Sequence, residues 1–210
     1  YFLLYFLASI KIPFIKKEIP QKINVLFMES GSGFGGSAKC LSLLLKHLDK
    51  NKFCAKVIYY NRGPSIDAIV RGGISAAPYN FFSLLTNVIK SDIVYINNEI
   101  YSHVLNIILA RIFGKKCICH MRGIRKLTRG EKVVACLIDR FIAVSHICSQ
   151  NLVSQRINKA KIDVIYDGIE IKNSIMPKDL TDGFAVGVVS RIIPKKGHMA
   201  FLEAARILVG

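Results

Sequence analysis

The sequence predicts an α/β protein in which helices flank a parallel β-sheet, and three observations lead to this fold class. From residue 22 onward, short apolar segments rich in β-branched residues alternate with segments of helical periodicity. A glycine-rich segment separates the first such strand from the first helix. Hydrophobic residues make up 51% of the 210 residues, which is ample for a buried core. Alternation of this kind is typical of parallel β-α-β units and therefore of a Rossmann-like sheet.

The predicted elements follow one another with short connections. The first helix is the clearest, because Leu41, Leu44, Leu45 and Leu48 lie on one of its faces. The segment NRGPS (61–65) is a predicted turn. Strands are predicted at 22–29, 54–60, 92–98, 115–120, 139–145 and 161–167. Helices are predicted at 36–49, 81–90, 101–113, 131–138 and 146–156.

The composition changes near residue 168 and predicts a second domain. The stretch 168–183 is polar and contains Gly and Pro. It covers the end of the first domain, which we place at 22–175, and an interdomain linker at 176–183. A strand at 184–190, a loop and a helix then form the first β-α unit of a second Rossmann-like domain at 184–210. One such unit cannot bury its own apolar faces, so we expect the rest of that domain beyond residue 210.

The N-terminal segment 1–21 is apolar and then basic. Its opening, YFLLYFLASI, has ten residues, fewer than the roughly 20 that span a bilayer, and four lysines follow it by residue 22. Two interpretations stay open: the end of a membrane anchor with a cytoplasmic basic flank, or an apolar element that packs on the domain. The chain does not begin with Met and ends within a helical pattern, so we expect a fragment.

The net charge of +16 favours an anionic partner, such as nucleic acid, an anionic membrane or a phosphorylated substrate. Between Arg111 and Lys132, eight Lys or Arg residues accompany one acid, Glu131. This cluster predicts either a solvated loop or a surface for an anionic leaflet or a lipid-linked diphosphate acceptor. The six cysteines form no C-x-x-C pair, which predicts reduced thiols and no zinc site.

The glycine-rich segment fits G-x-G-x-x-G at Gly31, Gly33 and Gly36. A loop between a strand and a helix N-terminus is suited to binding phosphate. A dinucleotide site also needs an acid at the end of the second strand, but the residues there are Tyr59-Tyr60-Asn61-Arg62. Arg62 could instead meet a 2′-phosphate, so an NADP site remains an alternative, as does a simple turn that begins a helix.

Five segments, taken in order, resemble the family-four retaining glycosyltransferases of the GT-B fold. They are ESGSGFGGSAKCLSLLLKHL (29–48), ICHMRG (118–123), DRFIAVSHICSQNLV (139–153), VIYDGIE (164–170) and VGVVSRIIPKKGHMAFLEAARIL (186–208). Three positions depart from the family pattern: Asp167 stands where Asn is usual, Glu170 where Asp is usual, and Ser190 where Gly is usual.

The resemblance implies roles for particular residues in a cleft at the carboxyl ends of the strands. His120 would be the catalytic residue near the transferred sugar, and Arg122 and Ser145 would line the cleft. Arg191 and Lys196 would hold the donor diphosphate. The loop glycines Gly33, Gly35 and Gly36 would lie near the phosphates or the acceptor. Asp167 and Glu170 are interpreted as turn and hinge residues.

The resemblance also implies an activity: transfer of a sugar from a nucleotide-sugar donor to a glycan or lipid-linked acceptor in cell-envelope polysaccharide synthesis. It implies no cofactor, no metal and no nucleic-acid partner. We expect a cytoplasmic, hexosyltransferase-type enzyme that sits peripherally at the inner face of the membrane. The family's two Glu residues, eight positions apart, would lie beyond residue 210, so we expect this fragment alone to be inactive. The alternatives are an NADP-dependent oxidoreductase and a basic nucleic-acid-binding protein.

Overall fold

The computed structural model describes residues 22–30, 35–171, 185–190 and 192–209. The chain divides into two compact units, Tyr1–Glu170 and Ile171–Gly210. The predicted N-terminal segment 1–21, the linker at 176–183 and part of the glycine loop lie outside the described residues.

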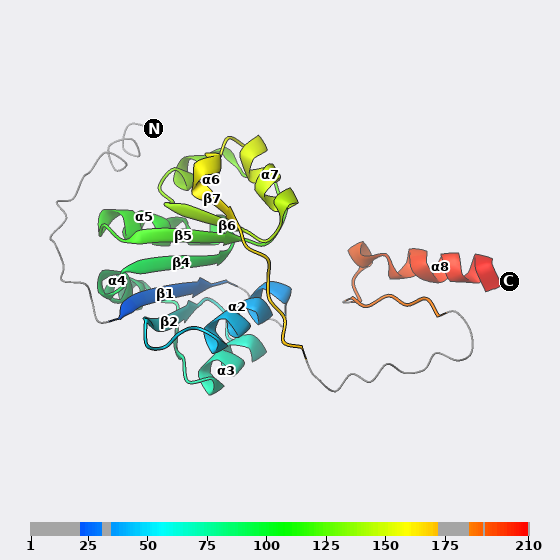
Figure 1. Ribbon diagram of the computed structural model, residues 1–210, viewed down its shortest axis with the longest axis horizontal. Helices are drawn as coiled ribbons and strands as arrows, with labels where there is room; N and C mark the ends of the chain where they lie inside the picture. The colour runs from blue at the N-terminus through cyan, green and yellow to red at the C-terminus, as the bar shows by residue number, and fades with distance from the viewer. Residues whose placement is uncertain (1–21, 31–34, 172–184, 191, 210) are drawn as a thin grey trace. The chain divides into compact units, whose positions relative to one another are not determined.

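A seven-stranded parallel sheet forms the centre of the first unit, in the order β3-β2-β1-β4-β5-β6-β7 (Figure 1). The strands are β1 (Ile23–Glu29), β2 (Phe53–Tyr59), β3 (Ser75–Pro78), β4 (Ile93–Asn98), β5 (Lys116–Met121), β6 (Arg140–Ala143) and β7 (Ile162–Val164). The central strands are long apolar runs because both faces of a parallel sheet are covered by helices. The predicted fold class is therefore confirmed.

Helices connect consecutive strands. They are α2 (Gly36–Lys46), α3 (Pro64–Arg71), α4 (Phe81–Lys90), η1 (Tyr101–His103), α5 (Val104–Ile112), α6 (Arg129–Ala135), α7 (His146–Ser154) and η2 (Lys159–Lys161). Several begin at a side-chain cap, of which the most complete is at α6. There Thr128 accepts from the Glu131 backbone, and the Glu131 carboxylate accepts from the Thr128 backbone.

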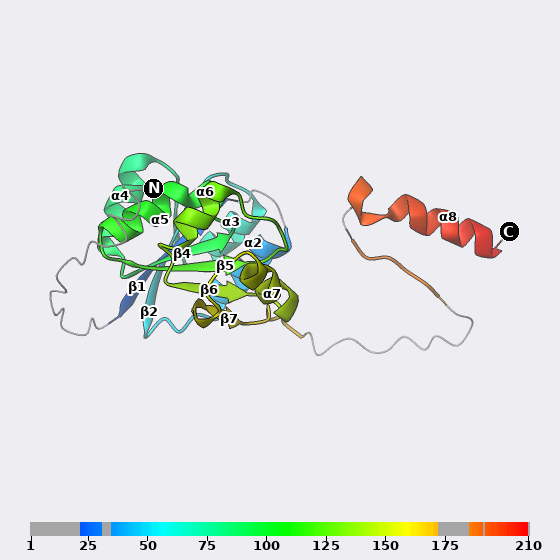
Figure 2. The ribbon, with the colours of Figure 1, turned by 90° about the horizontal axis from the view of Figure 1, so that it is seen from above.

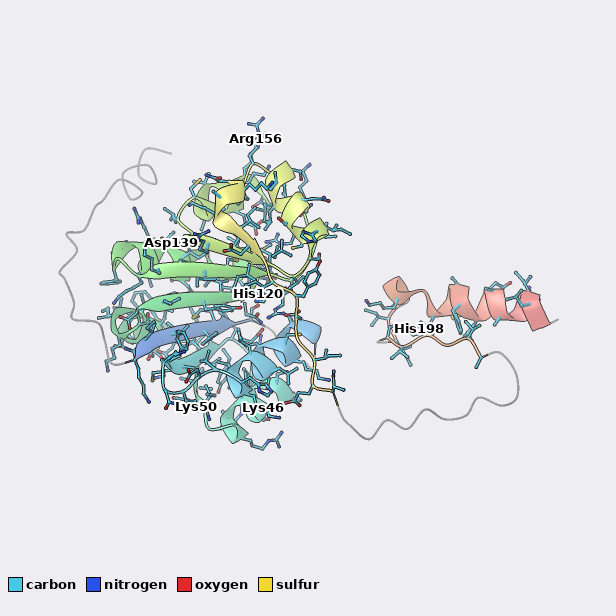
Figure 3. All side chains as sticks on the ribbon, in the orientation of Figure 1. Lys46, Lys50, His120, Asp139, Arg156 and His198 are labelled. Atoms are coloured by element: carbon cyan, nitrogen blue, oxygen red, sulfur yellow. The ribbon has the colours of Figure 1, made fainter. Side chains whose placement is uncertain are left out.

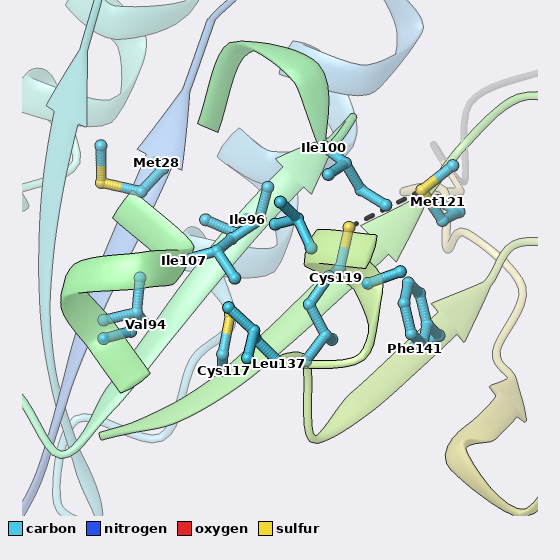
Figure 4. Close-up of a cluster of buried hydrophobic side chains, with 14 of the residues drawn as sticks. Met28, Val94, Ile96, Ile100, Ile107, Cys117, Cys119, Met121, Leu137 and Phe141 are labelled. Carbon is cyan, nitrogen blue, oxygen red and sulfur yellow. Dashed lines mark hydrogen bonds between the residues drawn. The ribbon is translucent and has the colours of Figure 1, made fainter. Parts of the chain in front are cut away.

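Side chains alternate between two hydrophobic layers along each strand. One layer lies under α4, α5, α6 and α7 and includes Ile96, Cys119 and Phe141 (Figure 4). The other lies under α2 and α3 and includes Phe27 and Tyr95. Because only two helices cover this second face, the sheet there is less completely covered beyond β4, where Ile118 and Ile142 are only partly buried.

Three elements of the first unit were not predicted: helix α3, strand β3 and the 3-10 turn η2. Helix α3 has eight residues and begins with Pro64 inside the expected turn, and β3 is a four-residue edge strand that pairs only with β2. Figure 2 shows the sheet and its helices from above, after a rotation of 90°.

The second unit contains a 3-10 turn, η3 (Pro194–Lys196), followed by α8 (His198–Val209). The predicted helix at 198–210 is present over its described length. The predicted strand at 184–190 is wrong for the described residues 185–190, which form no strand. A strand needs a hydrogen-bonded neighbour, and the described part of this unit offers no second extended segment.

Candidate functional site

The carboxyl ends of the strands meet at one edge of the sheet, and the strand order reverses there between β1 and β4. In open parallel sheets this reversal marks the crevice where ligands bind. A cavity of about 350 Å³ lies at this edge on the face that carries α2. Its lining residues are Cys40, Leu43, Leu44, His47, Tyr95, His120, Arg122, Ile142 and the segment 165–170. The cavity occupies the incompletely covered part of the sheet.

His120 is the penultimate residue of β5 and points to the α2 face, because it lies two residues after Ile118 on the same strand. Figure 3 labels His120 at the edge of the sheet, where it is buried, with only 6% of the residue exposed. Its Nδ1 contacts the Tyr95 hydroxyl and lies 3.2 Å from Arg122 Nη2. Its Nε2 is buried and has no hydrogen-bond partner among the described residues. Burial, aided by the Arg122 charge, lowers the pKa of His120 to about 4, so the ring is neutral at pH 7.

Arg122 follows β5 and lies largely buried, with 5% of its side chain exposed. Its guanidinium contacts three groups: Nε donates to Asn97 Oδ1 at 3.0 Å, Nη2 faces His120 Nδ1, and Nη1 pairs with Asp167. A guanidinium held on three sides has a fixed orientation. His120 and Arg122, both predicted site residues, are thus brought together in the cavity.

Glu29 and Asn97 belong to the same cluster, although the sequence analysis did not single them out. Glu29 ends β1 and is 1% exposed, and Asn97 in β4 is fully buried. Asn97 Nδ2 donates to Glu29 Oε2 at 2.5 Å and lies 3.4 Å from the Ser37 carbonyl in the first turn of α2. The sequence feature that could have identified both residues is a polar side chain close to the end of an apolar strand.

The segment after β7 crosses the carboxyl edge toward α2 (Figure 1). Asp167 reaches Arg122, and Glu170 accepts from Lys46 Nζ at 2.6 Å and lies 3.0 Å from His47 Nε2. Burial and the nearby Asp167 carboxylate raise the pKa of Cys40. Asp167 and Glu170, interpreted from the sequence as turn and hinge residues, thus tie this segment to other elements of the first unit.

The glycine loop is only partly described, since Gly31 and Gly33 lie outside the described residues. Gly35 is the N-cap of α2 in ordinary extended backbone, with φ of −74°, and makes no side-chain cap. A Cβ atom on Gly36 would meet nothing within 4 Å, and one on Gly35 would meet only Ser37 Oγ at 4.0 Å. The packing of the described residues therefore does not require glycine at either position.

The other predicted site residues lie apart from the cavity lining or cannot be placed against it. Ser145 is the N-cap of α7, and its hydroxyl accepts from the Cys148 backbone at 3.2 Å, which is a structural contact. Arg191 lies outside the described residues. Lys196 ends the η3 turn of the second unit and is exposed.

The basic cluster between 111 and 132 does not form one patch. Strand β5 runs through it, so Lys115 and Lys116 lie at the amino end of the strand and Arg122 at the carboxyl end. Six residues of strand separate the two groups by roughly 17 Å. Arg125 is paired with Glu131, and its guanidinium lies over the Tyr101 ring.

No group of three or more His, Cys, Asp or Glu within the described ranges could hold a metal ion. All six cysteines are free thiols, and Cys117, Cys119 and Cys148 are buried. None of the described helices is long and apolar enough to cross a membrane.

Comparison with known proteins identifies similar structures rather than similar sequences. No protein-family model matches the chain, and no curated protein sequence matches it. HepE from Anabaena in complex with UDP matches with a TM-score of 0.61 and 17% identity, over 70% of this chain and 45% of HepE. WaaB, a lipopolysaccharide outer core galactosyltransferase, matches with a TM-score of 0.52 and 17% identity, over 77% of this chain and 50% of WaaB.

A UDP-GlcNAc 2-epimerase from Neisseria meningitidis, bound to UDP-GlcNAc, matches with a TM-score of 0.50 and 16% identity, over 68% of this chain and 45% of the epimerase. The chain thus spans about half the length of each of these proteins. At such low identity the likeness shows the fold alone: this chain has a Rossmann-like α/β fold of the kind found in GT-B glycosyltransferases.

Proposed function

We propose that this protein is a glycosyltransferase that moves a sugar from a nucleotide-sugar donor to a glycan or lipid-linked acceptor, with retention at the anomeric carbon. The observation that carries the proposal is the cavity at the strand-order reversal, which combines a buried Arg122 with a His120 Nε2 that has no partner among the residues the structure describes. HepE has been solved with UDP-glucose and WaaB is a galactosyltransferase, which makes UDP-sugars the first donors to test.

The proposed roles follow from the charge that develops in the reaction. When the sugar departs, negative charge grows on the leaving diphosphate, and fixed cations and helix N-termini stabilise such charge. We assign that role to Arg191 and Lys196, which match the family motif. His120 Nε2–H would donate to a sugar hydroxyl, and the N-terminus of α2 with its glycine loop would face phosphate or acceptor oxygens.

The alternatives make different predictions. An NADP enzyme would use Arg62 to bind the 2′-phosphate, but Arg62 Nε already pairs with Asp67 at 3.0 Å and lies on the exposed end of β2. A nucleic-acid binder would use the net charge of +16. The fold is also shared with a UDP-GlcNAc 2-epimerase, which would alter the sugar without an acceptor.

Ligand-induced shifts in melting temperature of the full-length protein separate these possibilities. We expect UDP-glucose or another nucleotide sugar to raise the melting temperature, and NADPH and duplex DNA to leave it unchanged. The His120→Gln variant should lose about a hundredfold in transfer rate, the scale for removing one donor to the reacting group. His146→Gln, an exposed histidine on α7, is the matched control. A shift with NADPH alone would overturn the proposal.

We further propose that an anionic membrane surface is a partner, and that the carboxyl edge on the α4–α5–α6 side faces it. Apolar side chains are exposed there, including Phe82 at 77%, Tyr101 at 61% and Ile124 at 62%. Lys126 and Arg129, which follow Ile124 closely in sequence, are also exposed. Helices α4 and α5 contain no Asp or Glu. A cavity of about 460 Å³ between α5 and α6 is lined mainly by apolar residues, which suits the chain of a lipid-linked acceptor.

Sedimentation of the full-length protein with vesicles tests this surface. Binding to vesicles with anionic lipid should fall as salt rises, because exposed charges are screened within about 8–10 Å near physiological ionic strength. Replacing both Lys126 and Arg129 with Ser should weaken binding by about 1 kcal/mol for each charge. Ile124→Ser should also weaken it, whereas Ile147→Ser on α7, equally exposed, should not. If the protein bound neutral vesicles at high salt as strongly as anionic vesicles, the proposed electrostatic contribution to membrane binding would be contradicted.

A further inference from the structure

We infer that Glu29 and Asn97 are positioning residues that act through Arg122 to hold His120 as a neutral ring with its proton on Nε2. The tautomer itself follows from the contacts, and its consequence for transfer rests on the function proposed above. Glu29 is the first residue of the first segment that carries the family resemblance, and Asn97 lies in none of the five segments.

All four side chains lie on one face of the sheet. Glu29 is two residues after Phe27 in β1, and Asn97 is two residues after Tyr95 in β4, so the alternation of strands directs them to the α2 face. Arg122 is likewise two residues after His120. All three groups are buried: at most 5% is exposed of Glu29, Asn97 or the Arg122 side chain.

The Glu29 carboxylate determines which way the Asn97 amide points. A carboxylate oxygen accepts hydrogen bonds, and the amide nitrogen of Asn97 faces Glu29 Oε2 at 2.5 Å. The amide oxygen then faces Arg122 Nε at 3.0 Å, where it accepts. With the amide reversed, its oxygen would face the Glu29 carboxylate and its nitrogen would face the Arg122 donor, so two buried hydrogen bonds would be lost.

The fixed Arg122 in turn selects the His120 tautomer. The Tyr95 hydroxyl at Nδ1 can donate or accept, so by itself it leaves both tautomers open. Arg122 Nη2, 3.2 Å from the same nitrogen, can only donate. Nδ1 must therefore accept, and the single proton of the neutral ring resides on Nε2. This gives the cavity a hydrogen-bond donor at a nitrogen that has no partner among the described residues.

Nitrogen-15 NMR of the histidine rings tests the inference without any substrate. In the wild-type protein at pH 7 we expect His120 to show a protonated Nε2 and a bare Nδ1. In Asn97→Leu we expect loss of this single state, with signals of the Nδ1-protonated ring appearing. Asn87→Leu, the same change on α4 at a residue whose side chain donates to Ser83, should keep the wild-type pattern.

The single variant removes the hydrogen bond that Asn97 donates to the buried Glu29 carboxylate, and this loss could prevent folding. The double variant Glu29→Leu/Asn97→Leu removes both polar groups, which is far less costly, and still releases Arg122 Nε. In an active full-length protein, we expect this variant to lose about a hundredfold in kcat with little change in donor KM, the scale for misplacing a reacting group.

Two results would overturn the inference. One is a wild-type His120 that carries its proton on Nδ1, which needs no variant to observe. The other is a folded Asn97→Leu or double variant that keeps the single wild-type tautomer. If the NMR results are as expected but no variant or wild-type protein turns over a nucleotide sugar, the inference stands and the proposed function fails.

Discussion

Lowering the pH from 7 to 4 should destabilise this protein through a histidine outside the cavity. His103 is completely buried beside Tyr60, and its Nδ1 lies 2.9 Å from Asn106 Nδ2. Its Nε2 finds no partner in the described part of the chain. Burial lowers the pKa of His103 to about 4, because a charged ring cannot be solvated there.

The sign and size of the effect follow from proton linkage. The unfolded chain takes up the proton near pH 6.5 and the folded protein only near pH 4, so the unfolded state gains stability as the pH falls between these values. A difference of this size corresponds to about 3 kcal/mol, fully developed below about pH 4. His120, whose pKa is also lowered to about 4, adds a loss of similar size over the same range.

Urea unfolding at several pH values measures this contribution. We expect the free energy of unfolding of the wild-type protein to fall steeply between pH 6.5 and 4. In His103→Gln the fall should be smaller by about 3 kcal/mol, because one titrating group is gone. His146→Gln, at an exposed position, should not flatten the fall in this way. An unchanged pH dependence in His103→Gln would refute the reasoning.

Further predictions concern the core, a helix cap and the donor site. Leu41→Ala should lower the free energy of unfolding by about 2–5 kcal/mol, because Leu41 is completely buried, and a loss below 1 kcal/mol in urea unfolding would contradict its placement in the core. Thr128→Ala should cost about 1 kcal/mol in the same assay through loss of the capping box, and an unchanged value would show that the cap contributes nothing. Arg191→Ala and Lys196→Ala should each lower turnover of the full-length enzyme about a hundredfold with little effect on folding, and full activity in Arg191→Ala would show that the donor diphosphate binds elsewhere.

The strands of the first unit could be predicted because their apolar runs are distinct and short. Helix α3 and strand β3 were missed for physical reasons. The eight residues of α3 begin at the proline of a Gly-Pro pair, which also marks a turn. Strand β3, with the sequence SAAP, has little strand propensity and owes its place to pairing with β2. The prediction of a strand at 184–190 was wrong for the opposite reason. Its β-branched residues favour a strand, but there is no neighbouring strand among the described residues to pair with.

The candidate site was partly predictable. His120 and Arg122 could be selected because both lie at the carboxyl end of a strand, and the parallel sheet brings such ends to one edge. Glu29 and Asn97 could have been found by the same argument, since each is a polar residue at the end of an apolar strand. Asp167 could not, because its contact with Arg122 joins residues 45 positions apart and depends on the path of the chain after β7. The basic cluster between 111 and 132 is the reverse case. Its residues are close in sequence, but strand β5 runs between them and separates them in space.

The most direct test of the central claim is the product of a turnover assay with the full-length protein. A UDP-sugar and a lipid-linked or glycan acceptor would be incubated with the enzyme, and the anomeric configuration of the product read by proton NMR. We predict acceptor-dependent release of UDP and a product with the configuration of the donor, both abolished to near background in His120→Gln. Conversion of the sugar without an acceptor, or an inverted product, would contradict the account.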